Sequence, residues 1–346
     1  MDRVLKRLPK ALLPWYAQNK RELPWRKDKE PYHVWLSEIM LQQTRVEAVK
    51  GYYSRFLEAL PDIEALADCE DDKLHKLWEG LGYYSRVRNL KKAAQELLQR
   101  YGGKFPESHN EVLSLPGIGE YTAGAICSIC YDLPTPAVDG NVLRVVSRLL
   151  NDPTPIDQPA QKKKIALALA EIYPKAAGDF TQALMELGAT LCGPNRPPDC
   201  ENCPCKGFCL GKKAGTAPML PVKSPKKQRR EEERTVLILR CEGSYALAKR
   251  PAHGLLAGMW QFPDVEGKLS PEQALDWIRA MGMTPRDICL QAEKIHVFTH
   301  VQWNMRGLYI TVAEPCDRLH WVAGNILEKE YALPTAYRQF WDADFF

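Results

Sequence analysis

Apolar residues in the first two thirds of the chain recur at helical spacing. Over residues 31–60 the spacing is interrupted only by the polar run Gln42-Gln43-Thr44, so the pattern predicts two helices joined at that run. Comparable patterns cover residues 161–173 and 179–192. Helices should therefore dominate up to about residue 210.

The pattern changes in the last third of the chain. The runs TVLILR and YALAKR predict strands, SPEQALDWIRAMG predicts a helix, and HVFTHVQWNMRGLYITVAE predicts a hairpin. Between the two regions lies GKKAGTAPMLPVKSPKKQRREEE, which is rich in Lys, Pro, Arg and Glu. We interpret this stretch as a linker that is basic enough to lie along DNA.

A glycine-containing turn, Leu115-Pro116-Gly117-Ile118-Gly119, separates two of the predicted helices. Its glycines allow a backbone turn that side chains would block. The helix that follows is predicted over 121–131. Its first N–H groups lack internal partners and lie at the positive end of the helix dipole, so they are suited to hold a phosphate. An ordinary helix end followed by a loop is an equally good interpretation of this turn alone.

Asp139 opens the next predicted helix after the extended run 134–138. An Asp at this place can simply cap the helix, which is worth about 1 kcal/mol. It can also face a nucleotide held by the preceding turn, although spacing alone favours the cap. The order LPGIG…VDGN resembles the helix-hairpin-helix DNA glycosylases, the superfamily of endonuclease III.

Glu38 falls among the apolar residues Trp35, Leu36, Ile39 and Met40, which is unusual for a carboxylate. Desolvation at such a place raises the pKa of a carboxyl group, so that it can hold a proton near neutral pH. The commoner alternative is a glutamate on the solvent-facing stripe of an amphipathic helix.

A second tight turn, Gly80-Leu81-Gly82, carries Tyr83 and Tyr84 and is followed by Arg86 and Arg88. A tyrosine on a rigid turn beside phosphate-binding arginines is suited to wedge into a base stack. Both tyrosines could equally be ordinary core residues.

Composition adds three limits. A chain of 346 residues suggests two domains, and 45% hydrophobic with 26% charged residues fits a soluble globular protein. The net charge of +4 is mild, so a DNA site must arise from local clustering. The basic N-terminus is interrupted by Pro9 and Pro14 and contains no apolar signal core, and we find no transmembrane run.

Eleven cysteines in an apparently cytosolic chain argue against a disulfide framework. Cys192, Cys200, Cys203 and Cys209 form a C-x7-C-x2-C-x5-C run, with Cys205 left over. Thiolates this close together suit a metal cluster. A zinc knuckle usually offers two C-x2-C pairs, whereas this run has one.

Seven motifs together closely resemble the bacterial adenine DNA glycosylase family, MutY, over nearly the whole chain: PWR, SEIMLQQTRVE, WEGLGYYSRVRNL, LPGIGEYTAGAI, AVDGNVLRV, QALMELGATLC and GLLAGMWQFP. The resemblance implies an enzyme that hydrolyses the N-glycosidic bond of a flipped adenine mispaired with 8-oxoguanine or guanine in duplex DNA. It also implies a 4Fe–4S cluster. The family's first cysteine interval is usually six residues, and here it is seven.

The fold class implied is a mainly α N-terminal part with two helical lobes and a 4Fe–4S loop, followed by an α+β Nudix-like domain. The expected boundaries are 1–211 for the glycosylase domain, 212–233 for the linker and 234–346 for the domain that reads 8-oxoguanine. Within the first domain, the six-helix barrel lobe covers about 26–133. The iron–sulfur lobe takes the N-terminus and about 134–211.

Four matching positions carry the expected chemistry. Glu38 protonates a ring nitrogen of adenine, and Asp139 stabilises the oxocarbenium ion or bonds to it. Such glycosidic cleavage generally needs one neutral and one charged carboxyl group. Asn141 orients Asp139 and the water, and Tyr121 covers the sugar. In the strand-cleaving endonuclease III branch a lysine stands where this chain has Tyr121, so the resemblance implies a monofunctional enzyme.

Other matching positions are expected to bind DNA. Arg26 and Gln182 line the adenine pocket, and Gln43 and Tyr83 insert into the duplex. Tyr83 is expected to contact the 8-oxoguanine side of the mispair.

The remaining carried-over positions are the turn glycines and one loop. Gly117 and Gly119 grip the DNA backbone. The family's Phe-Ser-His loop, here Phe298, Thr299 and His300, reaches 8-oxoguanine. The alternative for the loop is a continuous strand whose side chains alternate between two faces.

Rival functions are a bifunctional glycosylase/lyase, a non-catalytic damage-binding protein and a Nudix hydrolase. The last would need the acidic R-E-x-x-E-E helix, which is absent after Gly267. The expected partner is double-stranded DNA with an A·8-oxoguanine or A·G mispair, bound by a monomer. We expect no membrane association and a bacterial cytoplasmic location, at the nucleoid when on DNA.

Overall fold

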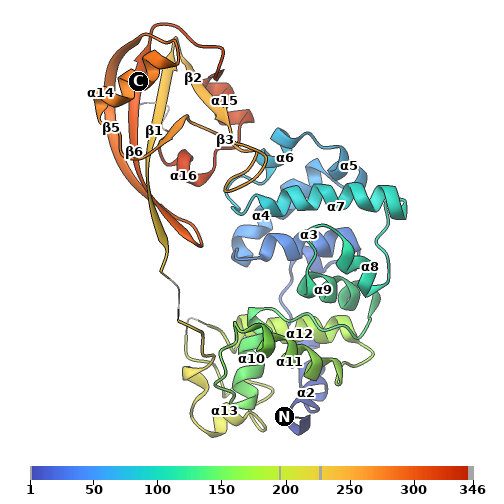
Figure 1. Ribbon diagram of the computed structural model, residues 1–346. Coiled ribbons are helices and arrows are strands. Elements are labelled where there is room, and N and C mark those ends of the chain that lie inside the picture. Colours follow the sequence, from blue (N-terminus) through green and yellow to red (C-terminus); the bar gives the residue numbers. More distant parts are fainter. Residues whose placement is uncertain (1, 195, 226–227, 342–346) are drawn as a thin grey trace. The chain divides into compact units, whose positions relative to one another are not determined.

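The computed structural model describes residues 2–194, 196–225 and 228–341, and the chain divides into two compact units (Figure 1). The helical unit consists of Met1–Asp68 and Asn89–Lys226. The C-terminal unit consists of Cys69–Arg88 and Lys227–Phe346.

Helices build the whole of the first unit. They are α1 (Asp2–Leu5), α2 (Leu8–Asn19), α3 (Pro31–Leu41), α4 (Val46–Ala59), α5 (Ile63–Asp68), α7 (Ser85–Tyr101, which begins in the other unit), α8 (His109–Ser114), α9 (Glu120–Tyr131), α10 (Gly140–Leu150), α11 (Pro159–Ala170), α12 (Ala177–Thr190) and α13 (Leu210–Lys213), with short 3₁₀ turns at Pro24–Arg26 and Ala217–Met219. None of the described helices is both long and apolar enough to cross a bilayer.

Apolar residues from three helices form a core of this unit. Leu8, Leu12, Val142, Val146 and Leu184 are buried together, which joins α2, α10 and α12. Helix α12 also packs against α9, and α9 packs against α3. The N-terminal end of α10 is thereby held beside the facing sides of α3, α9 and α12.

The predicted glycine turn lies between α8 and α9. Gly117 has a φ of 75°, and a Cβ added to it would lie 2.5 Å from the Cβ of Asn89, so local structure requires glycine there. Gly119 is the N-cap of α9, with a φ of −101°, and an added Cβ would meet no atom within 4 Å. Local structure therefore explains only the first glycine of the pair.

The C-terminal unit is built on a seven-stranded mixed sheet of order β3-β2-β1-β6-β5, with β4 paired to β1 and β7 paired to β2. The strands and helices are β1 (Arg230–Cys241), β2 (Ser244–Lys249), β3 (Trp260–Gln261), β4 (Asp264–Glu266), β5 (Pro285–Val297), β6 (Val301–Val312), β7 (His320–Ala323), α6 (Asp71–Leu77), α14 (Pro271–Ala280), α15 (Gly324–Glu330) and α16 (Thr335–Arg338).

Alternation along β1 gives the sheet two apolar faces. Val236 and Ile238 point to the face covered by α15 and α16, whereas Leu237 and Leu239 point to the face covered by α14. The predicted fold class, a helical glycosylase part followed by an α+β Nudix-like part, is confirmed.

The segment Cys69–Arg88 belongs to the C-terminal unit through polar contacts. Trp260 donates its indole N–H to Asp72 Oδ1 at 3.1 Å, and the backbone N–H of Leu333 donates to Glu79 Oε1 at 3.2 Å. The domain boundaries expected from the sequence place this segment in the glycosylase domain, residues 1–211.

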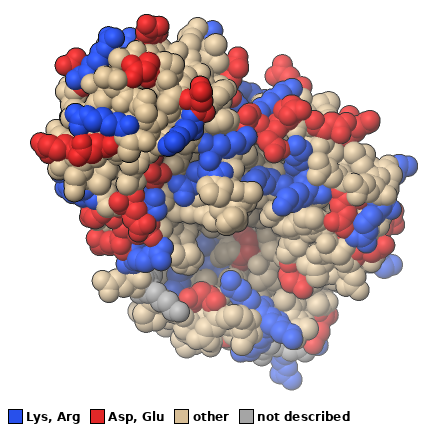
Figure 2. Space-filling model, turned by 45° about the horizontal axis from the view of Figure 1, so that its top comes forward, with Lys and Arg blue, Asp and Glu red and all other residues tan. Residues whose placement is uncertain are grey.

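Charged side chains of both signs are interspersed over the visible face of the molecule (Figure 2). This distribution agrees with the small net charge of +4. Any affinity for a polyanion therefore has to come from particular clusters of lysine and arginine.

Candidate active site

A large pocket of about 1080 Å³ lies within the helical unit. Its walls come from α3, the start of α9, the start of α10, α12 and the segment after α13. Seven of the residues singled out from the sequence line it: Arg26, Glu38, Gln43, Tyr121, Asp139, Asn141 and Gln182.

Glu38 is buried on α3 with 6% of its surface exposed, so the alternative of a solvent-facing glutamate is wrong. Burial raises its pKa to about 7, and the negative charge of Asp139 adds to the rise. Tyr121 donates its hydroxyl to Glu38 Oε2, which lowers the pKa but less than burial raises it. A substantial fraction of Glu38 therefore holds a proton at neutral pH.

Asp139 combines the two roles that the sequence left open. Its Oδ1 accepts from the backbone N–H of Val142 at 2.8 Å, which caps α10, and its Oδ2 accepts from Asn141 Nδ2 at 2.6 Å. Burial raises the pKa of Asp139 above its ordinary value, and these two donors and Arg144, which favour the ionised form, offset part of that rise. The capping bonds hold the carboxylate at the pocket wall.

A chain of buried polar contacts extends from Asn141 to the cysteine loop. Arg144 donates from Nη2 to Asn141 Oδ1 at 2.8 Å and from Nε to the carbonyl of Cys192 at 2.8 Å. A Cβ on Gly188 would lie 2.6 Å from the Cβ of Asn141, so this contact needs glycine on α12. Sequence reasoning missed both Arg144 and Gly188.

Glu186 is a further pocket residue that sequence reasoning missed. Its fully buried carboxylate accepts from Arg21 Nε at 2.6 Å and from Arg26 Nη2 at 2.8 Å. Burial alone would raise its pKa, but the two arginines hold the pKa below the ordinary value. The signal was present in the sequence, since Glu186 stands among apolar residues as Glu38 does.

The two residues expected to insert into a duplex share an unusual backbone conformation. Gln43 has a φ of 60° and lines the pocket of the helical unit, and Tyr83 has a φ of 47° and is half exposed in the C-terminal unit. Non-glycine residues in the left-handed region are uncommon and cluster at functional sites.

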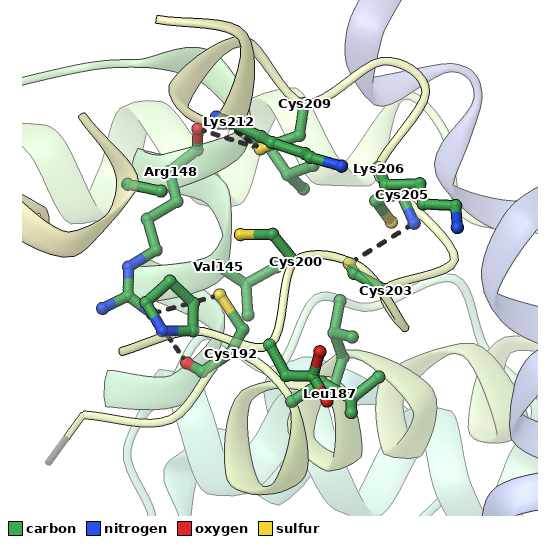
Figure 3. Close-up of a pocket in the computed structure, with 15 residues that line it drawn as sticks. Val145, Arg148, Leu187, Cys192, Cys200, Cys203, Cys205, Lys206, Cys209 and Lys212 are labelled. Atoms are coloured by element: carbon green, nitrogen blue, oxygen red, sulfur yellow. Dashed lines mark hydrogen bonds between the residues drawn. The ribbon is translucent and has the colours of Figure 1, made fainter. Parts of the chain in front are cut away.

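The five cysteines between 192 and 209 line one cavity of the helical unit (Figure 3). Arg148 Nη1 donates to Cys192 Sγ at 3.2 Å, and the backbone N–H of Lys212 donates to Cys209 Sγ at 3.5 Å. In Figure 3 Cys205 lies beside Lys206, on the far side of Cys203 from Cys192.

This donor set fits an iron–sulfur cluster. Five thiols line the cavity, N–H groups donate to three of the sulfurs, and Arg148, Lys206 and Lys212 supply positive charge for thiolates. Over the described part of the chain, no three His, Cys, Asp or Glu side chains form a group that could hold a single metal ion.

The predicted recognition residues Phe298, Thr299 and His300 form the turn between β5 and β6. The backbone N–H of Phe298 donates to the carbonyl of Val301 at 2.8 Å, which closes the turn. The alternative of a continuous strand through these residues is therefore wrong. Within the same unit, the hydroxyls of Tyr83 and Thr299 are 3.2 Å apart and hydrogen-bonded.

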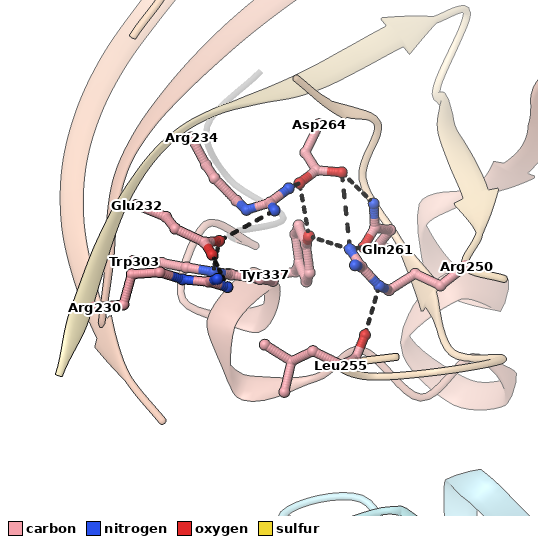
Figure 4. A network of polar contacts seen from close by, with 9 residues as sticks. All are labelled: Arg230, Glu232, Arg234, Arg250, Leu255, Gln261, Asp264, Trp303 and Tyr337. Carbon is pink, nitrogen blue, oxygen red and sulfur yellow. Dashed lines mark hydrogen bonds and ion pairs between the residues drawn. The ribbon is translucent and has the colours of Figure 1, made fainter. Parts of the chain in front are cut away.

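The buried Trp303 packs against this turn, and Figure 4 shows its polar partners. The ring of Phe298 meets the ring of Trp303 edge-on at 4.8 Å. Trp303 donates its indole N–H to Glu232 Oε2 at 2.9 Å, and the guanidinium of Arg234 covers its face at 4.4 Å. Arg234 is in turn held by Asp264 Oδ2 at 2.8 Å. These contacts fix the position of Phe298.

Two protein families match different parts of the chain. Residues 36–175 match the HhH-GPD superfamily base excision DNA repair proteins, and residues 234–343 match the NUDIX domain. Among solved structures, a thermostable thymine-DNA glycosylase has a TM-score of 0.56 at 26% identity and covers 61% of this chain and 98% of its own. A trapped endonuclease III–DNA intermediate, with a TM-score of 0.53 at 22% identity over 62% of this chain and 98% of its own, supports the fold alone.

Curated relatives extend over most of the chain. The adenine DNA glycosylase of Rattus norvegicus is 35% identical over 84% of this chain and 68% of its own, and that of Homo sapiens is 34% identical over 95% and 72%. The enzyme of Buchnera aphidicola subsp. Acyrthosiphon pisum is 33% identical over 84% and 82%. The chain therefore belongs to the adenine DNA glycosylase family.

Proposed function

We propose that this DNA glycosylase hydrolyses the N-glycosidic bond of adenine paired with 8-oxoguanine or guanine in duplex DNA, and that it does not cleave the strand. The observation that carries the proposal is the pair Glu38 and Asp139 in one pocket. Glu38 has a pKa of about 7 and is available as an acid, and Asp139 accepts hydrogen bonds that offset part of the rise in its pKa caused by burial.

The hydrogen bonds assign a task to each group. Tyr121 donates to Glu38 Oε2, so the proton of Glu38 belongs on Oε1, from which it passes to a ring nitrogen of the bound adenine. The protonated base leaves with the bonding electrons, and the positive charge on the sugar is offset by Asp139. Asn141 holds Asp139 in place while water attacks the anomeric carbon, and the proton that this water releases restores the acid form of Glu38.

The pair formed by Arg26 and Glu186 is suited to recognise the base. A carboxylate that accepts and a guanidinium that donates lie together in the pocket wall, so they match the amino group and ring nitrogens of adenine. Gln182 lines the same pocket and adds an amide with both capacities. These residues are proposed to orient the base for protonation by Glu38.

The direct test is purified protein on a duplex with one A·8-oxoguanine or A·G pair, measured as released adenine and as strand breaks before and after hot alkali. The proposal expects adenine release and breaks only after alkali. Breaks without alkali would indicate a bifunctional enzyme. Binding without adenine release would indicate a damage-binding protein.

Monofunctionality rests on the tyrosine at position 121. We expect Tyr121→Lys to confer some strand cleavage without alkali, because an amine there can form a Schiff base with the opened sugar. Borohydride should then trap a covalent protein–DNA adduct. Tyr121→Phe is the matched control and should give none. Adenine release by the lysine variant with no adduct would contradict the placement of this residue beside the sugar.

Members of this family and endonuclease III-like folds typically carry a 4Fe–4S cluster, and we propose that Cys192, Cys200, Cys203 and Cys209 hold one here. The cluster would tie the loop to α10, to which Arg148 and Arg144 already attach it.

We expect purified protein to be brown, with broad visible absorbance and iron rather than zinc on elemental analysis. Cys203→Ser should lose most of the iron. Cys205→Ser should retain it, because Cys205 lies outside the proposed ligand set. A colourless, zinc-loaded and fully active preparation would refute the cluster.

Two further contacts with DNA are proposed. The exposed N–H groups at Gly119 hold a phosphate, since the chain itself gives no reason for glycine there. In the C-terminal unit, the turn made by Phe298, Thr299 and His300 contacts 8-oxoguanine. Three observations support this contact: the closed turn, the packing of Phe298 on Trp303 and the hydrogen bond between Thr299 and Tyr83.

We expect the double variant Phe298→Ala with His300→Ala to process A·8-oxoguanine at least about fivefold less efficiently, since a lost specific hydrogen bond costs about 1–3 kcal/mol. The A·G reaction should change little, because guanine offers no oxidised group. Val297→Ala, on the adjoining strand, is the control. Single-turnover rates and affinities on both duplexes measure the effect. Equal losses on both duplexes would show that Phe298 and His300 do not recognise 8-oxoguanine.

A further inference from the structure

The segment that follows the cysteine loop forms part of the wall of the active-site pocket. Pro218, Met219, Leu220, Pro221 and Lys223 all line it, together with the opposing Glu38 and Gln43. These five residues, called the rim here, fall within the stretch that the sequence predicted as a linker.

The rim is pinned to the helical unit on both sides of Met219. Thr216 donates its hydroxyl to Asn151 Oδ1 at 2.6 Å, and the carbonyl of Leu220 accepts from Arg148 Nε at 2.8 Å. Leu220 itself is buried.

The pinning continues past Lys223. The carbonyl of Val222 accepts from the backbone N–H of Ile156 at 3.1 Å, and the N–H of Ser224 donates to Asp157 Oδ1 at 3.0 Å. The hydroxyl of Ser224 reaches the same oxygen at 3.2 Å. The rim is therefore a fixed wall of this unit, and one nearby carboxylate is already engaged by the chain.

Met219 stands out on this fixed wall because it is 72% exposed. Its neighbours are held by hydrogen bonds, but its apolar side chain lies at the pocket wall in contact with solvent. Lys223 and Lys162 line the same pocket, so an exposed apolar side chain and two cations occur in its lining. This combination matches a nucleic-acid strand, whose sugars and bases offer apolar surface between phosphates.

The size of the pocket agrees with an occupant larger than one nucleoside. Its volume of about 1080 Å³ lies at the upper limit of the ~300–1,000 Å³ typical of pockets that enclose a single small ligand. An adenine placed beside Glu38 and Glu186 leaves the part lined by the rim for neighbouring nucleotides.

We propose that the rim holds the DNA strand that carries the extruded adenine: Met219 packs on the sugar and base of an adjoining nucleotide, and Lys162 and Lys223 contact its phosphates. This proposal rests on the function proposed above. It adds a strand-holding surface separate from the catalytic carboxylates, so it concerns binding and leaves the chemical step unchanged.

The chain provides matched controls for two of the three contacts. Leu167 is 61% exposed on α11 and does not line the pocket, so Leu167→Ala controls for Met219→Ala. Lys163 adjoins Lys162 on the same helix but is not among the pocket residues, so Lys163→Gln controls for Lys162→Gln.

The experiment measures the affinity of the full chain for a duplex with a tetrahydrofuran abasic-site analogue opposite 8-oxoguanine, over a series of salt concentrations. Met219→Ala should weaken binding about tenfold, the scale expected when one or two buried methylene contacts are lost. Lys162→Gln and Lys223→Gln should each lower the slope of log affinity against log salt by about 1. The single-turnover rate of adenine release at saturating enzyme should stay within about twofold of wild type in all three variants, as expected for a binding role. Thermal unfolding checks that each variant is folded.

Equal affinities of Met219→Ala and Leu167→Ala, or equal salt slopes of Lys162→Gln and its control Lys163→Gln, would contradict the proposed role of the rim. A lower single-turnover rate at unchanged affinity would also contradict the proposal, because the substituted residue would then act in the chemical step and not in binding. If the proposed function is wrong, wild-type protein will release no adenine. The comparison of affinities and salt slopes would still test whether the rim binds DNA.

Discussion

Glu38→Gln is expected to lower the single-turnover rate of adenine release by about 10²–10⁴-fold, the usual contribution of a general acid. Glutamine keeps the shape of the side chain and can still accept the hydroxyl of Tyr121, but it has no acidic proton for the leaving base. DNA binding should survive, because the substitution removes no positive charge. A rate within threefold of wild type would exclude Glu38 as the acid.

The pH profile gives an independent check on Glu38. Because the carboxyl group acts in its protonated form and its pKa is raised to about 7, release should fall as pH rises above about 7. In the glutamine variant this limb of the profile should disappear. A wild-type rate that stays level up to pH 9 would contradict the assignment.

Glu38→Gln should raise the stability of the folded chain although it lowers the activity. The folded chain keeps the proton of Glu38 to about pH 7, whereas an unfolded glutamate loses it near the ordinary pKa of 4.5. The unfolded state therefore binds fewer protons between these values, and stability falls as pH rises through that window. Glu38→Gln should remove this loss of stability. At pH 8 the variant should therefore be more stable than wild type by up to about 3 kcal/mol. A higher Tm in the variant at pH 8 than in wild type would show that its lost activity is not misfolding.

Periodicity predicted the fold well because both units are built on regular amphipathic elements. The interruption at Gln42-Gln43-Thr44 does separate α3 from α4, and the apolar strands lie in one sheet. The first strand starts at Arg230, five residues before the apolar run that predicted it. Its early residues pair with β6, and backbone bonds of this kind give no hydrophobic signal.

Residues of the site differ in how visible they are from sequence. A carboxylate in apolar surroundings is a local signal, and it identified Glu38 and would have identified Glu186. The position of Arg144 between Asn141 and Cys192 depends on how α10 meets α12, which spacing along one chain cannot give.

The rim was missed for a related reason. Its composition of proline and lysine is typical of a linker. Its fixed conformation comes from hydrogen bonds to Asn151, Arg148, Ile156 and Asp157, which lie far from it in sequence. Composition indicates which conformation a segment favours in isolation. The hydrogen-bond partners that fix the rim come from other parts of the folded unit, so composition does not indicate them.

Asp139→Asn is expected to lower adenine release by about 10²–10³-fold, similar to the loss of one fixed electrostatic group at a developing charge. This substitution separates the two roles of the residue. Asparagine caps helices about as well as aspartate, so the bond from the N–H of Val142 should persist and α10 should keep its stability. Only the negative charge that faces the sugar is removed.

Asp139→Ala completes the comparison. It removes both the charge and the cap, so it should lose activity to a similar extent and in addition about 1 kcal/mol of unfolding free energy. Single-turnover rates and denaturant unfolding of both variants distinguish the roles. If Asp139 were a cap alone, the asparagine variant would work like wild type, and the alanine variant would lose activity only as far as it unfolds. A large loss of rate in a fully stable asparagine variant requires a carboxylate that acts on the reaction, because the helix start that holds it would be unchanged.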